Sequence, residues 1–133
     1  MRYLSLAWMD AARRAVASDD GLRAATAGVR LTVEHVVTDV PEWAPGGTIS
    51  WHITIDDGAV DLIPGPAAES DVRFTTDYGT AALIAAGDLA AQRAFAEGRL
   101  RVGGDLSCLT RHQKALSGID DALAAVRAET ANL

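Results

Sequence analysis

The sequence predicts an α+β fold, with a largely antiparallel sheet of five strands and helices over one face of that sheet. Apolar and polar residues alternate, as in strands, in four segments between residues 29 and 75 and in a fifth near residue 100. Apolar residues recur at helical spacing before, between and after these segments, an order typical of α+β domains. Because the strands are half polar, the second face of the sheet is expected to meet solvent.

Two helices are expected before the first strand. Ser5 is a suitable N-terminal cap, and apolar residues recur around it every three or four positions. This apolar stripe consists of Leu4, Trp8, Met9, Ala12, Ala15 and Val16. A shorter second helix is expected from about Asp19 to Ala27, and Gly28 is expected to end it.

Alternation and one turn define the first three strands. One face of the first strand carries Val29, Leu31, Val33, His35 and Val37. A loop rich in proline and glycine, residues 41–47, leads to a second alternating strand. Asp57-Gly58 favours a two-residue hairpin, which pairs Ile55 with Val60 and Ile53 with Leu62. Because both pairs are apolar, the turn and the alternation predict the same register.

The remaining chain is expected to alternate between short helices and single strands. A fourth strand contains Val72 and Phe74, and a fifth, residues 99–102, places Leu100 and Val102 inward, followed by a turn at Gly103-Gly104. Three helices are expected to begin at acidic caps, namely Asp77, Asp88 and Asp105. The third of these carries Leu106, Leu109 and Leu116. Glycines are expected to end the helices, the last before a final amphipathic helix, at Gly87, Gly98 and Gly118.

Composition excludes several classes of protein. The chain has 133 residues, enough for one domain spanning residues 1–133, and its 49% hydrophobic content argues against disorder. A formal net charge of -6 disfavours binding to nucleic acid. No apolar run is long enough to span a bilayer, and charged residues interrupt the N-terminal segment early, so we expect no stable membrane insertion and a cytoplasmic location. A single cysteine, Cys108, and histidines without ligand spacing predict no metal and no cofactor.

Two segments of the chain resemble the sterol carrier protein-2 family, in particular its bacterial stand-alone members. The first is the strand Leu31 to Val37 with the hairpin at Asp56-Asp57-Gly58 and the following Pro64-Gly65-Pro66-Ala67. The second runs from Gly87-Asp88-Leu89 through Phe95 to Gly98-Arg99-Leu100-Arg101-Val102 and Gly103-Gly104-Asp105-Leu106. The resemblance extends over about Leu4 to Leu116. It implies a mixed five-stranded sheet covered by helices, with an apolar tunnel between the two layers.

The resemblance also implies a function. We expect an intracellular carrier, not an enzyme, that binds or transfers a fatty acid, fatty acyl-CoA, sterol or phospholipid without a cofactor. The apolar ligand would be its partner, and a homodimer is left open. The residues expected to line the tunnel are Leu83, Ile84, Phe95, Leu100, Val102, Leu106, Leu109, Trp51 and His35.

Three alternatives to a carrier remain open in the sequence. His35, on an apolar strand face, could be a general base of a small isomerase or hydrolase, although a buried histidine with a structural role is the simpler interpretation. Cys108 lies four residues before His112 and could be a nucleophile, with ordinary packing favoured. The chain could also be an accessory module whose groove accepts a partner. The basic residues of the last third could face an anionic headgroup or solvent: Arg93, Arg99, Arg101, Arg111 and Lys114.

Overall fold

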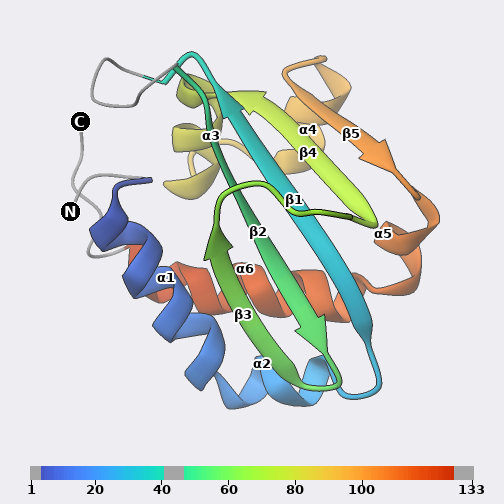
Figure 1. The fold of residues 1–133 in the computed structure, drawn as a ribbon. Coiled ribbons are helices and arrows are strands. Elements are labelled where there is room, and N and C mark those ends of the chain that lie inside the picture. Colours follow the sequence, from blue (N-terminus) through green and yellow to red (C-terminus); the bar gives the residue numbers. More distant parts are fainter. Residues whose placement is uncertain (1–3, 41–46, 128–133) are drawn as a thin grey trace.

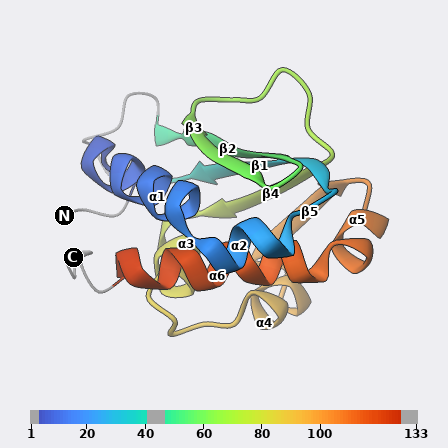
Figure 2. The same cartoon turned by 90° about the horizontal axis from the view of Figure 1, so that it is seen from below.

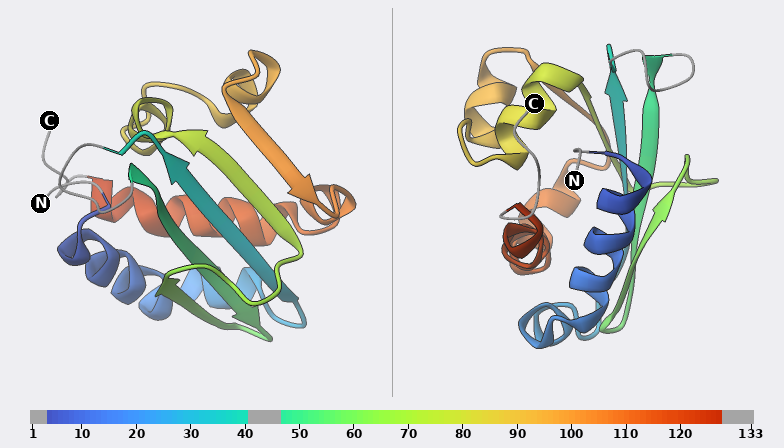
Figure 3. Two further views of the ribbon diagram at one scale, coloured as in Figure 1. Left: turned by 45° about the horizontal axis from the view of Figure 1, so that its top comes forward. Right: turned by 90° about the vertical axis from the view of Figure 1, so that its left-hand side faces the viewer.

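The computed structural model describes residues 4–40 and 47–127. A five-stranded sheet has the order β3-β2-β1-β4-β5, and the helices lie over one of its faces (Figures 1 and 3). The strands are β1 (Arg30–Thr38), β2 (Ile49–Asp56), β3 (Ala59–Pro64), β4 (Val72–Asp77) and β5 (Leu100–Gly104). The helices are α1 (Leu6–Ser18), α2 (Asp20–Ala25), α3 (Tyr78–Ala85), α4 (Ala91–Ala96), α5 (Ser107–Arg111) and α6 (Gln113–Arg127). The predicted α+β class is confirmed.

The first two helices begin where the sequence predicts. The Ser5 side chain accepts a hydrogen bond from the Trp8 amide at 3.2 Å, and Asp19 accepts one from the Leu22 amide at 2.8 Å. The predicted stripe of α1 is buried at Trp8, Met9, Ala12 and Val16. This stripe packs between β3 and α6, as the view from below shows (Figure 2).

The sheet is mixed because β1 pairs antiparallel with β2 and parallel with β4. The β2–β3 hairpin has the predicted register, with Ile55 opposite Val60 and Ile53 opposite Leu62. All four side chains are buried beneath the helices. The hairpin therefore forms as its turn and its alternation require. The expected loop over residues 41–47 lies, except for Gly47, outside the described residues.

The other face of the sheet is not simply solvated. Glu34 of β1 points away from the helices, yet it is only 2% exposed. The loop between β3 and β4, which arches over this face in Figure 2, covers it. The Glu34 carboxylate accepts hydrogen bonds from Arg73 at 2.8 Å, Ser70 at 3.3 Å and the Ala67 amide at 3.2 Å. Glu34 thus anchors this loop to the sheet.

Two predicted caps are wrong in detail. The Asp77 side chain does cap α3, but α4 begins after Ala90 without a side-chain cap, so Asp88 does not have this role. Asp105 accepts hydrogen bonds from the amide and hydroxyl of Ser107, and the residue at the N-terminal cap of α5 is Leu106. An acid two or three residues before a helix can satisfy other groups of the turn, and the sequence does not distinguish these positions.

Gly87 and Gly98 follow the ends of α3 and α4 with positive φ, as predicted, but Gly103, Gly104 and Gly118 have other roles than the predicted ones. Gly103 and Gly104 belong to β5, and Gly104 has a φ of 88° in close contact with the Asp71 carbonyl. The chain bends instead at His112, which separates α5 from α6. Helix α6 continues through Gly118, where an added Cβ would lie 2.9 Å from the Leu22 side chain. Gly118 is therefore a close contact between α6 and α2 and not a helix end.

Candidate ligand-binding site

A cavity of about 670 Å³ lies between the inner face of the sheet and helices α3 and α6. Alternation along β1 and β2 directs Val33, His35, Val37, Trp51 and Ile53 into it. The opposite wall is formed by α3 and by one side of α6, which contributes Leu116, Ile119 and Leu123 at helical spacing. The volume falls within the range of about 300–1,000 Å³ that is typical of small-molecule pockets.

The composition of α3 explains why the protein is hollow here. The residues of this helix and its C-terminal turn that face the cavity are mostly small: Gly79, Ala81, Ala82, Ala85 and Ala86. Their side chains do not reach the sheet, whereas the large residues of α1 and α2 fill the space below β2 and β3. The space between sheet and helices is therefore filled next to α1 and α2 and open next to α3.

Five of the residues predicted to contact a ligand line this cavity. They are Leu83, Ile84, Leu100, Trp51 and His35. The other four do not belong to its lining. Val102 and Leu109 are partly buried against the core, while Phe95 is 54% exposed and Leu106 52% exposed.

The correction at Phe95 and Leu106 has a physical reason. Helix α4 directs Ala94, which is 0% exposed, toward the interior, and this orientation turns the adjacent Phe95 outward. Strand β5 continues through Gly104, so the chain does not fold back at the predicted turn and α5 begins beyond the edge of the sheet. Leu106 therefore lies outside the region between sheet and helices.

Several lining residues were not predicted, although strand alternation could have identified those of the sheet. Val33, Val37 and Ile53 share strand faces with His35 and Trp51, so alternation places them in the same wall. Phe74 follows from the same pattern in β4. The residues of α6 could not be found, because the sequence predicted a helix end at Gly118 in the middle of their stripe.

His35 is held in the cavity wall by aromatic contacts. Its ring stacks on Trp51 with centroids 3.9 Å apart and an interplanar angle of 4°, and it lies 5.4 Å from the Phe74 ring. Burial disfavours the imidazolium ion and lowers the pKa of His35 to about 4, although the nearby negative charge of Glu34 opposes this shift. His35 is therefore neutral at pH 7. Glu34 projects from the opposite face of the strand, so the two side chains do not form a catalytic pair.

Trp51 joins the two parts of the core. Its ring packs edge-on against Trp8, with centroids 5.8 Å apart, and His35 stacks on it. The indole nitrogen of Trp51 is buried and, within the described residues, has no hydrogen-bond acceptor. A buried N–H group without an acceptor lowers the stability of the fold. The contacts of the Trp51 ring with Trp8 and His35, and not a hydrogen bond, therefore hold the indole in this position.

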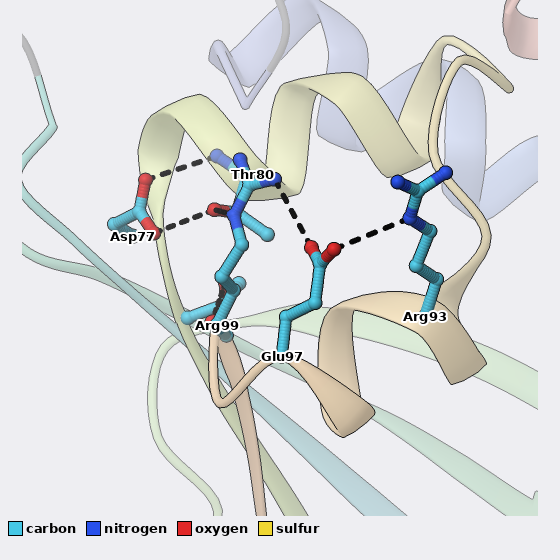
Figure 4. A network of polar contacts seen from close by, with 6 residues as sticks. Asp77, Thr80, Arg93, Glu97 and Arg99 are labelled. Carbon is cyan, nitrogen blue, oxygen red and sulfur yellow. Dashed lines mark hydrogen bonds and ion pairs between the residues drawn. The ribbon is translucent and has the colours of Figure 1, made fainter.

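A polar network outside the cavity positions α3 (Figure 4). The Asp77 carboxylate accepts bonds from the Thr80 amide at 3.0 Å and the Thr80 hydroxyl at 2.7 Å, and these bonds lower the pKa of Asp77 below its ordinary value. The Thr80 hydroxyl also accepts a hydrogen bond from Arg99, whose guanidinium lies 3.7 Å from Glu97. Glu97 in turn pairs with Arg93. The network ties the start of α3 to the α4–β5 corner.

The basic residues of the last third do not converge on the cavity. Arg93 and Arg99 share Glu97, and Arg111 pairs with Asp105. Lys114 lines a separate cleft of about 470 Å³ between α2 and α6. The arrangement favours the solvent-facing interpretation of this cluster.

Cys108 does not have the environment of a nucleophile. The thiol is buried, and burial together with the nearby Asp105 carboxylate raises its pKa. Its sulfur lies 3.2 Å from the Arg111 guanidinium. The thiol is therefore protonated at pH 7 and packs in the core.

Within residues 4–40 and 47–127, no group of three histidine, cysteine or acidic side chains is arranged to hold a metal ion. None of the helices in this part of the chain combines the length and the apolar composition needed to cross a membrane.

Solved structures share this fold. A crystal structure of a sterol carrier protein 2 superposes with a TM-score of 0.75 at 19% identity, covering 92% of this chain and 98% of that one. A protein from Thermus thermophilus, described as possibly a sterol carrier protein, gives 0.74 at 20% identity, with coverages of 95% and 90%. A sec-alkylsulfatase, Pisa1 from Pseudomonas sp., gives 0.52 at 20% identity over 74% of this chain and 14% of its own, so the same fold also occurs within an enzyme.

The sequence itself matches a family profile. No curated protein is significantly similar to the chain. The profile of the SCP-2 sterol transfer family, however, matches residues 10–117, most of the length. This family supports binding or transfer of lipids and sterols in general. The chain belongs to the SCP-2 sterol transfer family.

Proposed function

We propose that the protein binds an apolar small molecule in the cavity between the sheet and helices α3 and α6, and carries it without chemical change. The observation that carries this proposal is the cavity of about 670 Å³ with its largely apolar walls. Fatty acids, fatty acyl-CoA, sterols and phospholipids are the ligand classes to be tested. The tunnel implied by the sequence resemblance would be this cavity.

Burial of hydrocarbon supplies the driving force. Each methylene group transferred from water into the cavity contributes about 0.8 kcal/mol, so a chain of about 12 carbons gains on the order of 9 kcal/mol before association costs. Binding in the micromolar range requires about 8 kcal/mol net, so a 12-carbon chain reaches it only if the association costs take up a small part of this gain, and longer chains have a larger margin. Polar contacts are needed only to orient the ligand.

The chemistry of the wall supports a carrier over an enzyme. Among the described lining residues, the candidates for general acid–base catalysis are one histidine, His35, and one carboxylate, Asp88. The His35 ring is stacked between aromatic rings. General acid–base catalysis requires groups that exchange protons with a substrate near neutral pH. A histidine with a pKa of about 4 is a poor match for this task.

Ligand binding to the purified protein tests the proposal. Native mass spectrometry should detect an added mass that disappears on delipidation. An apolar ligand should then raise the melting temperature of the delipidated protein. At a hundredfold excess over its dissociation constant, it should increase the free energy of unfolding by about 2.7 kcal/mol. If ligands of every chain length and headgroup leave the melting curve unchanged, the carrier proposal is wrong.

The remaining predictions accompany this proposal. They are one domain over residues 1–133, a cytoplasmic location, no binding to nucleic acid and, as an open question, a homodimer. An accessory role for a separate enzyme would show as a stable complex in which a partner chain occupies the cavity.

A further inference from the structure

The described part of the cavity wall offers no cationic partner for a negative charge. Among the described residues, no lysine or arginine contributes to the lining. Asp88 does contribute, and it is exposed, so it lies where the cavity meets solvent. The nearest charged group that an entering headgroup would meet inside the lining is thus a carboxylate.

The arginines outside the cavity are already engaged. Except for Arg101, every arginine whose side chain is described pairs with a carboxylate. Arg99 and Arg101 both flank Leu100, which lines the cavity. Arg101 is exposed and does not contribute to the lining, whereas the guanidinium of Arg99 is bound to Thr80 and Glu97 (Figure 4). Recruiting it would break the network that positions α3.

His35 does not supply a positive charge either. Its ring lies against Trp51 and Phe74, and the nearby titratable group is Glu34 on the other face of β1. The pKa of about 4 keeps the imidazole neutral above pH 5. A neutral imidazole has one N–H donor and one acceptor nitrogen, so it suits a hydroxyl or a carbonyl group.

We propose that this cavity selects an uncharged ligand, an apolar molecule bearing at most a hydroxyl, ketone or ester group, over a fatty acid anion or acyl-CoA of the same chain length. This inference rests on the proposed carrier function and names its ligand class. A carboxylate that enters the wall unpaired must first take up a proton. At pH 7.5 about one carboxyl group in a thousand is protonated, for a pKa of about 4.3, which sets the upper limit of the discrimination.

Three probes with one chain length test the selection. The delipidated protein is titrated at pH 7.5 with 1-dodecanol, methyl dodecanoate and dodecanoate, each below its aggregation concentration, and displacement of a fluorescent apolar dye is measured. The alcohol and the ester should bind at least tenfold more tightly than the anion. If dodecanoate binds within tenfold of dodecanol, the inference is overturned while the carrier function stands. If none of the three binds, and ligands of other chain lengths and headgroups also leave the melting curve unchanged, the carrier function itself fails.

A charge variant provides the second arm. Asp88→Asn should raise the affinity for dodecanoate relative to that for dodecanol about two- to threefold, because it removes a repulsive charge at the exposed side of the cavity. Asp10→Asn, on the exposed face of α1 in an ion pair with Arg14, is the matched control. An unchanged ratio of the two affinities in Asp88→Asn would contradict the repulsive role of this carboxylate.

Discussion

Two neighbouring residues of β1 show how strand geometry separates two roles. His35 faces the cavity and stacks on Trp51, whereas Glu34 faces the loop between β3 and β4 and pairs with Arg73 at 2.8 Å. His35 is half-buried under the helices at the cavity, whereas Glu34 is buried by the loop. The contributions of His35 and Glu34 to stability can be measured separately, because the two side chains change protonation in different pH ranges.

The protonation of His35 predicts a pH dependence of stability. Its folded-state pKa of about 4 lies below the ordinary value of 6.5, so the unfolded chain binds more protons between these values. The free energy of unfolding should therefore fall as the pH is lowered from about 6.5 to 4, with a slope approaching 1.4 kcal/mol per pH unit. His35→Phe, which keeps a ring against Trp51, should remove about one proton from this slope. Urea denaturation at several pH values measures it, and an unchanged slope would refute the burial of a neutral imidazole.

Glu34 should stabilise the loop between β3 and β4. Burial raises the pKa of Glu34, but hydrogen bonds from Arg73, Ala67 and Ser70 outweigh it and the net pKa is lowered. Its contribution is therefore present above its ordinary pKa and is lost as the pH falls through the folded-state value. Glu34→Ala leaves these donors unpaired and should cost about 1–3 kcal/mol at pH 7. Glu69→Ala, an exposed acid of the same loop, should change the free energy of unfolding by less than about 0.5 kcal/mol.

At the scale of elements, the strands were predictable and the last helices were not. Alternation in β2 and β3 and the Asp57-Gly58 turn predict one register for this hairpin, so two independent signals support each other. After β5 the signals conflict. Gly104 looks like a turn residue, yet it is required inside a strand, where a Cβ would collide with the Asp71 carbonyl. A contact with a residue so distant in sequence cannot be read from the local pattern.

This interpretation of Gly104 makes a prediction about stability. Gly104→Ala should cost about 2 kcal/mol or more, because its φ of 88° is strained for alanine and the Asp71 backbone blocks the Cβ. Gly103→Ala is the matched control, since nothing lies within 4 Å of an added Cβ there. Chemical denaturation of both variants measures the difference. Equal costs would show that the close approach of β5 to β4 is not as described.

The candidate site shows the same division between what the sequence predicts and what it does not. The strand side of the cavity is consistent with alternation, which puts His35 and Trp51 on the apolar strand faces, while their role in a cavity wall was implied by the family resemblance. The exposed positions of Phe95 and Leu106 could not be predicted, because helices α4 and α5, of six and five residues, are too short for apolar periodicity to define a buried face. The family resemblance implied a tunnel between sheet and helices. The cavity that is found lies against α3 and α6, and Phe95 and Leu106 are not part of its wall.

On the scale of the whole molecule, stability and binding occupy different parts of one fold. Helices α1 and α2 pack large side chains against β2 and β3, while the small residues of α3 leave a cavity against β1, β4 and the part of β2 that carries Trp51 and Ile53. We propose that this cavity receives an apolar ligand. In a filled core, a larger side chain at α3 would cost about 1–3 kcal/mol through overpacking.

The most direct measurement compares Ala82→Trp with Leu106→Trp. Ala82 faces the cavity, whereas Leu106 is 52% exposed on the surface, so both variants add an indole but only the first enters the proposed site. We predict that Ala82→Trp lowers the affinity for a fluorescent apolar ligand at least tenfold, while its free energy of unfolding stays within about 1 kcal/mol of the parent protein. Leu106→Trp should alter neither quantity. Unchanged ligand binding in a destabilised Ala82→Trp variant would contradict the account and place the binding site elsewhere.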